Sequence, residues 1–371
     1  MILAVPRETA RSERRVALVP ESVARFVKLG ATVVVQRDAG TNAAFPDAAY
    51  EKAGATIASD IATLARDADA LLCVGRPSEE LLSLARKGTT LVGFLNPLGD
   101  PAYLSHLAER GLTALAVESI PRITRAQPMD ALSSQSNIAG YKAVLVAAST
   151  LPRFFPMLTT AAGTIPPAKV FIIGAGVAGL QALATARRLG AVTSGYDARP
   201  VVKEQVQSLG ATFVEFDIGD AEGSGGYAKE LTAEQLARQQ RAMAETIARN
   251  DAVITTAAVP GRRAPLIVTQ EAVAAMQPGS VIVDLAAETG GNCALTKRDE
   301  TIVTDNGVTI VGTTNLASTM PYDASRLYSR NLFALLSPFV KDGALALDPS
   351  DEVVKGACVV RDGAVLTGGA S

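Results

Sequence analysis

The sequence predicts an α/β protein with two parallel-sheet domains, the second inserted into the first, and three observations support this class. Short apolar runs alternate with helical patterns in the first part of the chain, which is typical of parallel sheets covered by helices on both faces. A second alternating series follows, after which the tail returns to helix without another full set of strands. The length of 371 residues also exceeds what a single hydrophobic core usually supports.

The first domain is expected over residues 1–132 with a C-terminal return at 322–371. Its strands are expected in MILAVP, ATVVVQ, DALLCVG, TTLVGFL and LTALAVE, and its helices in PESVARFVKLG, PDAAYEKAG, EELLSLARKG and PAYLSHLAERG. Each of these helical segments stops at a glycine, the residue that most readily ends a helix. Two long helices, near 135–150 and 322–339, are expected to cross between the domains.

The second domain is expected over residues 133–321. Its strands are expected in KVFIIG, AVTSGYD, ATFVEF, AVITTAA and SVIVDLA, and its helices in AGLQALATARRLG, KEQVQSLG and AEQLARQQRAMAETIARN. TIVTDNGVTIVG predicts a late hairpin in which Asn306 and Gly307 supply the turn.

Composition excludes several classes of function. The net charge is −2 and no run of like charge stands out, so nothing indicates a nucleic-acid or anionic membrane surface. The three cysteines are far apart, which argues against a disulfide framework or a metal site and suits a reducing cytosol. No signal peptide or membrane-spanning helix is expected. The single histidine, His106, lies among Leu and Ala in a predicted helix, so we expect a mechanism without a histidine base.

The sharpest local motif is VFIIGAGVAGLQALATARRLGAVTSGYDA, residues 170–198. It is an apolar strand, a GxGxxG turn, an Ala-rich helix and an acid at the end of the next strand, which together form the dinucleotide-binding pattern of a Rossmann-like fold. Gly174 permits the tight turn, and Gly176 lets the backbone approach a pyrophosphate at the helix N-terminus. Gly179 lets the helix pack closely against the strand.

Asp197 is expected to accept hydrogen bonds from the adenosine ribose and to repel a 2′-phosphate, which favours NAD(H) over NADP(H). Arg199 opposes this reading, because a nearby arginine can accommodate that phosphate. The expected cofactor site also includes neighbouring residues of the motif and one residue of TTAAVPGRRAP: Ala175, Val177, Ala198 and Ala258.

AEGSGGYAKEL, residues 221–231, is a glycine-rich insert before the long charged helix. Gly225 and Gly226 would make it mobile, and Tyr227 would give it an amphipathic tip. From the residues alone, a lid over the cofactor and a plain flexible loop are equally good readings.

PRITRAQPMDALSSQSNIAG, residues 121–140, collects hydrogen-bonding side chains in a chain that is 48% hydrophobic. From composition alone the simple readings are favoured: Asp130 caps the helix that follows, Ser133 belongs to its first turn, and Gln127 is an exposed loop residue.

Four segments, PRET…RRVALVP, GAGVAG, TTAAVPGRRAP and VIVDLAAETGGN, resemble the family shared by alanine dehydrogenases and the NAD(H)-binding domain I of proton-translocating nicotinamide nucleotide transhydrogenase. The resemblance covers the whole chain. In the dehydrogenases a lysine and a histidine handle the proton, and the matching positions here are Gly75, beside Arg76, and Asn96. Arg15, which matches the substrate-carboxylate arginine, remains. The missing pair favours the transhydrogenase branch, where hydride passes between two nicotinamides without proton transfer between the reactants.

In that branch the polar loop resembles one named for its Arg, Gln and Asp, which match Arg122, Gln127 and Asp130, with Ser133 following. The resemblance implies that Arg122 fixes the nicotinamide carboxamide, and that Gln127 bonds the nicotinamide ribose and reaches toward the second nucleotide. Asp130 and Ser133 would complete these contacts, while Arg125 receives no role. Gly226 and Tyr227 match the family's mobile loop, which strengthens the lid reading.

The resemblance further implies an NAD(H)-binding alpha-1 subunit or domain that forms homodimers. It would dock on an NADP(H)-binding domain and a membrane subunit, on the cytoplasmic face of the inner membrane. Two alternatives stay open: an alanine or related amino-acid dehydrogenase, and a non-enzymatic NAD-sensing protein.

Overall fold

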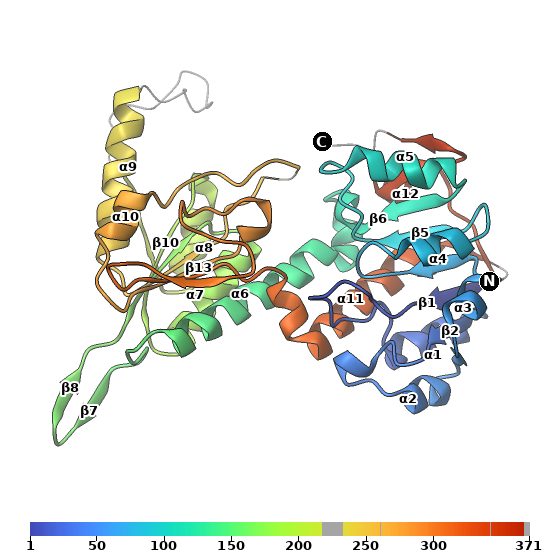
Figure 1. The fold of residues 1–371 in the computed structure, drawn as a ribbon, viewed down its shortest axis with the longest axis horizontal. Coiled ribbons are helices and arrows are strands. Elements are labelled where there is room, and N and C mark those ends of the chain that lie inside the picture. The colour runs from blue at the N-terminus through green and yellow to red at the C-terminus, as the bar shows by residue number, and fades with distance from the viewer. Residues whose placement is uncertain (217–232, 260, 342, 367–371) are drawn as a thin grey trace. The chain divides into compact units, whose positions relative to one another are not determined.

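The structure, a computed structural model, describes residues 1–216, 233–259, 261–341 and 343–366. The chain forms two compact units, and the second is inserted in the first (Figure 1). Unit 1 comprises residues 1–136 and 317–371, and unit 2 comprises 137–316, where 133–321 was expected for the second domain.

Within its described residues unit 1 contains an eight-stranded sheet in the order β19-β18-β6-β5-β4-β1-β2-β3. The strands β1 to β6 are parallel, whereas β18 runs antiparallel to β6 and β19 antiparallel to β18. The order 3-2-1-4-5-6 of the parallel strands is that of a Rossmann-like sheet. The strand bounds are β1 Ile2–Val5, β2 Thr32–Gln36, β3 Thr56–Ala58, β4 Ala70–Leu72, β5 Thr90–Gly93, β6 Thr113–Ala116, β18 Cys358–Arg361 and β19 Ala364–Val365.

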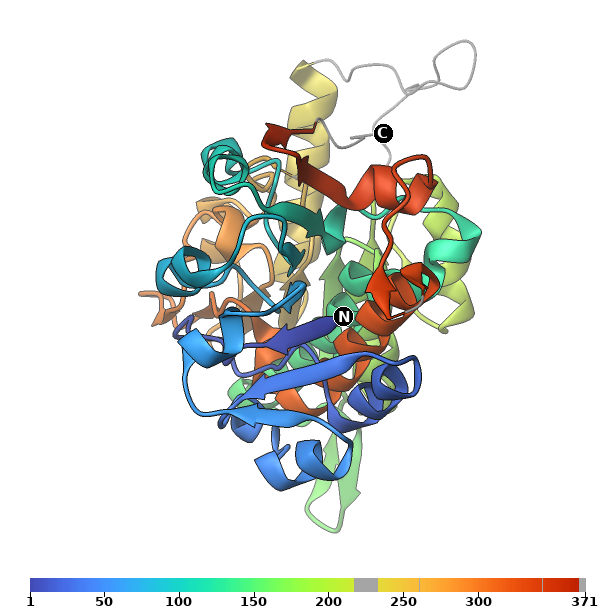
Figure 2. The same ribbon diagram turned by 90° about the vertical axis from the view of Figure 1, so that its right-hand side faces the viewer.

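Helices cover both faces of this sheet. Figure 2 looks onto unit 1 and shows its strands one above another, with the orange-red α11 on one side and the teal α5 on the other. Several helices begin at side-chain caps, since Asp60, Ser78 and Asp100 each accept from a backbone N–H of the first turn. The helices are α1 Pro20–Lys28, α2 Asp47–Lys52, α3 Ile61–Ala65, α4 Glu79–Leu84, α5 Pro101–Glu109, α11 Pro321–Leu336 and α12 Glu352–Ala357.

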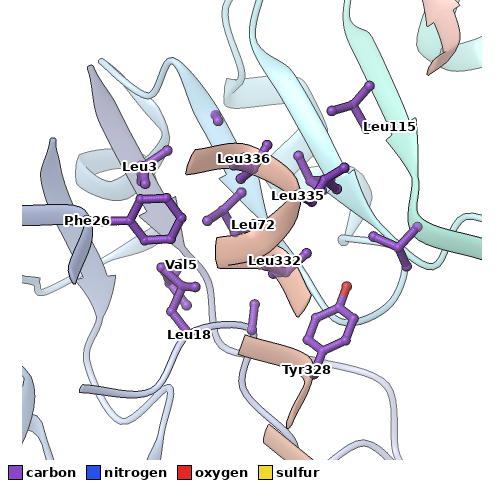
Figure 3. Close-up of a cluster of buried hydrophobic side chains, with 14 of the residues drawn as sticks. Leu3, Val5, Leu18, Phe26, Leu72, Leu115, Tyr328, Leu332, Leu335 and Leu336 are labelled. Carbon is purple, nitrogen blue, oxygen red and sulfur yellow. The ribbon is translucent and has the colours of Figure 1, made fainter. Parts of the chain in front are cut away.

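The main core of unit 1 joins its two stretches of chain. Leucines of α11, including Leu332 and Leu335, pack on apolar side chains of the parallel strands such as Leu3 and Leu72 (Figure 3). Tyr328 is fully buried there, and its hydroxyl donates to the carbonyl of Cys73 at 2.7 Å. This burial explains why the chain returns to unit 1 after unit 2.

Unit 2 contains, in its described part, a seven-stranded sheet in the order β11-β10-β9-β12-β13-β15-β14. All neighbours are parallel except the hairpin β14–β15, which confirms the hairpin expected around Asn306 and Gly307. The strand bounds are β9 Lys169–Ile173, β10 Val192–Tyr196, β11 Thr212–Phe213, β12 Ala252–Thr255, β13 Val281–Asp284, β14 Thr301–Val303 and β15 Thr309–Val311. The helices are α6 Ala131–Thr150, which begins in unit 1, α7 Val177–Arg188, α8 Lys203–Ser208, α9 Ala233–Ala248 and α10 Gln270–Ala274.

A second hairpin, β7 (Leu158–Thr160) with β8 (Gly163–Ile165), was not expected from the sequence. It projects away from the sheet and helices of unit 2 (Figure 1). Most of its residues are exposed, among them Ile165 and the adjoining Met157, at 63%.

Candidate functional site

The glycine-rich turn of unit 2 lies where β9 ends and α7 begins, beside the point at which strand order reverses between β9 and β12. Gly174 has φ +96°, a conformation that favours glycine. A methyl group at Gly179 would stand 1.8 Å from the carbonyl oxygen of Gly174, so α7 packs against the turn at glycine distance. At Gly176 the nearest atom to such a methyl group lies 3.9 Å away. The open space is therefore at Gly176, where a pyrophosphate was predicted.

Asp197 follows β10 and lies beside this turn. Its Oδ2 accepts the backbone N–H of Ala175 at 2.8 Å and Nη2 of Arg199 at 2.9 Å. Its Oδ1 accepts the backbone N–H and Nε of Arg199, both at 2.9 Å. Burial would raise the pKa of Asp197, but the hydrogen bonds from Arg199 and Ala175 outweigh it, and the pKa is lowered. The carboxylate is thus ionised and fully hydrogen-bonded.

The loop after β12 forms the other side of the same edge. Thr256 donates its hydroxyl to the carbonyl of Gly174 at 2.9 Å, which links this loop to the glycine turn. Ala257 follows, and then Ala258, which is exposed. Val177 at the start of α7 and Ala198 after Asp197 are exposed as well, whereas Ala175 is buried.

Asn292 holds the loop after β12 in place, a role that was not expected from the sequence. It is fully buried; its Oδ1 accepts the N–H of Ala257 at 3.0 Å, and its Nδ2 donates to the carbonyls of Ala257 and Pro265. The signal in the sequence was the polar end of VIVDLAAETGGN after an all-apolar strand.

Asp284, at the end of β13, organises the segment that carries Asn292. The carboxylate is buried and accepts from the hydroxyls of Thr255 and Thr296 and from three backbone N–H groups, including that of Asn292. A buried carboxylate with this many donors is satisfied without a ligand. Asp284 therefore supports the site structurally.

The polar loop of unit 1 contains the short 3₁₀ helix Thr124–Met129 and leads into α6. Asp130 accepts the N–H of Ser133 at 2.9 Å and its hydroxyl at 2.6 Å, so these two residues form a helix cap. Arg122 and Gln127 are exposed, and their side chains make no hydrogen bond or ion pair within the described residues. Arg125 differs, because it pairs with Asp351 at 2.7 Å.

The corresponding strand-order reversal in unit 1, between β1 and β4, is occupied by the protein itself. Glu8 accepts the N–H groups of Val74 and Gly75 at 2.6 and 3.3 Å. Burial, and secondarily the charge of Glu13, raise the pKa of Glu8 to about 7, against the lowering effect of those hydrogen bonds. The cavity beside Glu8 is about 10 Å³, room for about one water molecule.

The positions that match a dehydrogenase's substrate site are committed to internal contacts. Arg15 is buried, forms a two-pronged ion pair with Glu13, and donates to Gln135 at 2.8 Å. Arg76, beside Gly75, pairs with Asp100 at 2.7 Å. Asn96 lies in a turn with φ +53° and donates its backbone N–H to Glu118.

Other residues singled out from the sequence take surface roles or lie elsewhere. His106 lies on α5 near Glu79, 3.0 Å from its carboxylate. Gly226 and Tyr227 lie outside the described residues. Within the described part of the chain, no group of three His, Cys, Asp or Glu side chains could hold a metal ion. A search of the same residues finds no helix with the length and apolarity needed to cross a membrane.

Comparison with known proteins gives a consistent picture. The family models described as alanine dehydrogenase/PNT, N-terminal domain and C-terminal domain, match residues 4–139 and 143–368. An NAD(P) transhydrogenase subunit alpha chain of Rhodospirillum rubrum is 46% identical, over 99% of this chain and 98% of that protein. A crystal structure of transhydrogenase from Sinorhizobium meliloti is 46% identical with a TM-score of 0.89, covering 99% of this chain and 100% of that one. An L-alanine dehydrogenase structure is 26% identical with a TM-score of 0.80, covering 99% and 97%.

Proposed function

The chain belongs to the alanine dehydrogenase/PNT family, and we propose that it is the NAD(H)-binding component of a proton-translocating transhydrogenase. In this role it passes hydride directly between NAD(H) on this chain and NADP(H) on a partner domain. A separate membrane component would translocate the proton. The chain would then act on the cytoplasmic face of the inner membrane, held there by its partner subunits.

The observation that carries the proposal is the 46% identity to a transhydrogenase alpha subunit across nearly the full length of both chains. The alanine dehydrogenase of Bacillus subtilis is 30% identical over 86% of this chain. Both branches share the fold, so the difference in similarity supports the transhydrogenase branch.

The chemistry of the side chains supports the same choice. An amino-acid dehydrogenase must bind a substrate carboxylate and move a proton. Here Arg15 is buried against Glu13 and Gln135, and Gly75 and Asn96 carry no acid–base group. Hydride transfer between two nicotinamides needs neither function, because the protein only has to bring the two rings together in the right orientation.

Each part of the candidate site has a place in this proposal. Gly176 gives the pyrophosphate access to the N–H groups at the start of α7, and Asp197 receives the adenosine ribose. Arg122 and Gln127, exposed and without side-chain partners among the described residues, would hold the nicotinamide end. Asp130 can join them because a carboxylate has about four acceptor positions, and Ser133 supplies donors for two of them.

Homodimer formation is part of the proposal, and the β7–β8 hairpin supports it. A two-stranded hairpin is marginal in water unless another surface covers it. Replacing Met157 and Ile165 together by arginine is expected to convert dimer to monomer in sedimentation velocity. Val303→Arg, at a position that is 68% exposed in β14, is the control that should leave the dimer unchanged. A monomeric wild-type protein would contradict the proposal.

The central experiment mixes the chain with a recombinant transhydrogenase NADP(H)-binding domain loaded with NADP⁺, and adds NADH deuterated at the transferred position of C4. NADH and NADPH absorb alike, so the label in NADPH is followed by mass spectrometry. Direct transfer predicts that NADPH retains the deuterium without exchange with water. A transfer rate no higher than that of the mixed nucleotides would overturn the proposal, as would robust turnover of pyruvate and ammonia with NADH by the chain alone.

The polar loop is tested in the same assay. Arg122→Ala, Gln127→Asn and Asp130→Asn are expected to lower the transfer rate at least tenfold while changing the Kd for NADH far less, because they position the ring. Arg125→Ala is the matched control from the same loop, since Arg125 is occupied by Asp351. Variants that weaken NADH binding and leave the rate at saturation unchanged would contradict a positioning role.

A further inference from the structure

The hydrogen bonds of Asp197 raise a problem for the nucleotide site. A carboxylate has about four acceptor positions, and here the N–H of Ala175 and three N–H groups of Arg199 fill all four. A ribose hydroxyl can donate to Asp197 only when one of these donors leaves. Nucleotide binding at this site is therefore an exchange reaction at the carboxylate.

The donor that leaves must be the guanidinium of Arg199. The N–H of Ala175 belongs to the buried turn between β9 and α7, where Gly174 and Gly179 leave no space for a shift. The side chain of Arg199 is 59% exposed, whereas that of Asp197 is 9% exposed. The guanidinium thus covers the carboxylate from the solvent side and can swing away on its flexible stem.

We propose that Arg199 determines how strongly the site discriminates between NAD(H) and NADP(H), an inference that rests on the nucleotide site of the proposed function. With Arg199 present, a 2′-phosphate arriving beside Asp197 meets the displaced guanidinium, which offsets the repulsion by the carboxylate. Without Arg199 the phosphate faces the carboxylate alone. The arginine makes the site more tolerant of a 2′-phosphate than its acid implies.

The location of the guanidinium supports this role. Its Nη2 lies 3.9 Å from the position that a methyl group on Gly176 would take, so it stands at the rim of the turn where phosphate is expected. A purely structural ion pair elsewhere on the same unit offers a comparison. Arg153 pairs with Asp251 at 3.2 Å, and its side chain is 57% exposed, close to that of Arg199.

The test measures the Kd for AMP and for adenosine 2′,5′-bisphosphate by competition against the fluorescence of bound NADH. The ratio of the two constants isolates the 2′-phosphate from the nicotinamide end. Arg199→Ala is expected to raise the ratio in favour of AMP at least tenfold, and Arg199→Lys, which keeps the charge but not the fork, by less. Arg153→Ala should leave it within twofold of wild type.

Salt provides a second readout. In the wild type, raising the ionic strength should weaken the bisphosphate more than AMP, and Arg199→Ala should remove that excess dependence. A ratio within twofold of wild type in Arg199→Ala would overturn the inference, whichever way the separate constants move. Failure of the proposed function looks different, because the wild-type chain would then not bind NADH.

Discussion

At the scale of single residues, Glu8 shows how one carboxylate closes a site that the fold leaves open. It reaches from the end of β1 to the N–H groups after β4, at the strand-order reversal of unit 1. Unit 1 has the strand order of a nucleotide-binding sheet, yet it has no glycine-rich turn there and only a cavity of about 10 Å³. The residue that fills the crevice therefore separates the two units in function.

Glu8 also predicts a pH dependence of stability. Its pKa is raised from 4.5 to about 7, so the folded protein binds this proton more tightly than the unfolded chain does. The stabilisation is complete below pH 4.5 and is lost as the pH rises through 7, with a size of at most about 3 kcal/mol. In urea unfolding between pH 4.5 and 8, Glu8→Gln should flatten this decline.

Glu51→Gln, on the exposed side of α2, is the control and should keep the wild-type pH profile. Equal slopes for wild type and Glu8→Gln would show that Glu8 does not titrate in this range.

Asn292 is the second residue with a specific expectation. Asn292→Ala leaves the N–H of Ala257 and two carbonyls without partners in a buried place, so unit 2 should lose about 3 kcal/mol. Binding of NADH should weaken as well, because the loop after β12 loses its support. Urea unfolding and NADH titration measure the two effects.

Asn250→Ala is the matched control. The side chain of Asn250 donates to a single carbonyl, that of Thr246, and its loss should cost about 1 kcal/mol or less. Comparable losses for the two variants would argue against a special role for Asn292.

At the scale of elements, the strand–turn–helix of β9 and α7 separates fold from binding at two glycines. Gly176→Ala should leave the unfolding free energy within about 1 kcal/mol, because φ is −75° and the nearest atom to the new methyl group is 3.9 Å away. It should nevertheless raise the Kd for NADH at least tenfold by filling the place of the pyrophosphate. Chemical denaturation and NADH fluorescence test both effects.

Gly179→Ala gives the opposite pattern. Its methyl group would overlap the carbonyl oxygen of Gly174, so unit 2 should lose about 2 kcal/mol or more together with binding. If both variants lost stability equally, the open space at Gly176 would not be a ligand site.

The predicted elements differ from the structure mainly where they are short or isolated. The apolar runs of β1, β9, β12 and β13 were predicted because they are long and continuous. The strands β3, β18 and β19 were missed, since two to four residues carry no reliable period. The β7–β8 hairpin was missed as well, because its exposed Thr and Gly residues do not alternate with apolar ones.

At the scale of the whole molecule, the chain carries two Rossmann-like sheets and one nucleotide fingerprint. We expect hydrogen exchange with NADH present to slow in the glycine turn of unit 2 and in the polar loop of residues 122–133, but not around Val74 and Gly75. The physical reason is that bound nucleotide suppresses local opening only where it contacts the protein. At a hundredfold excess over Kd, the stabilisation of unit 2 should approach about 2.7 kcal/mol.

Exchange mass spectrometry with and without NADH measures this directly, and AMP serves as the control. AMP lacks the nicotinamide end, so it should protect the glycine turn and leave the polar loop unchanged. Protection of the loop by AMP, or its absence with NADH, would contradict the assignment of Arg122 and Gln127 to the nicotinamide end.

The sequence by itself determined the fold class, the glycine turn with Asp197, and the lack of a proton-handling pair, because periodicity, turn chemistry and residue identity are local properties. Only the tertiary structure decided that Arg15 is bound by Glu13 and Gln135, that Asn292 holds the loop at Ala257, and that Glu8 closes the crevice of unit 1. Most of these contacts join residues that lie far apart in the chain. Arg199 and Asp197 are two residues apart, yet their pairing needed the structure too, because it depends on how the turn after β10 orients both side chains toward Ala175.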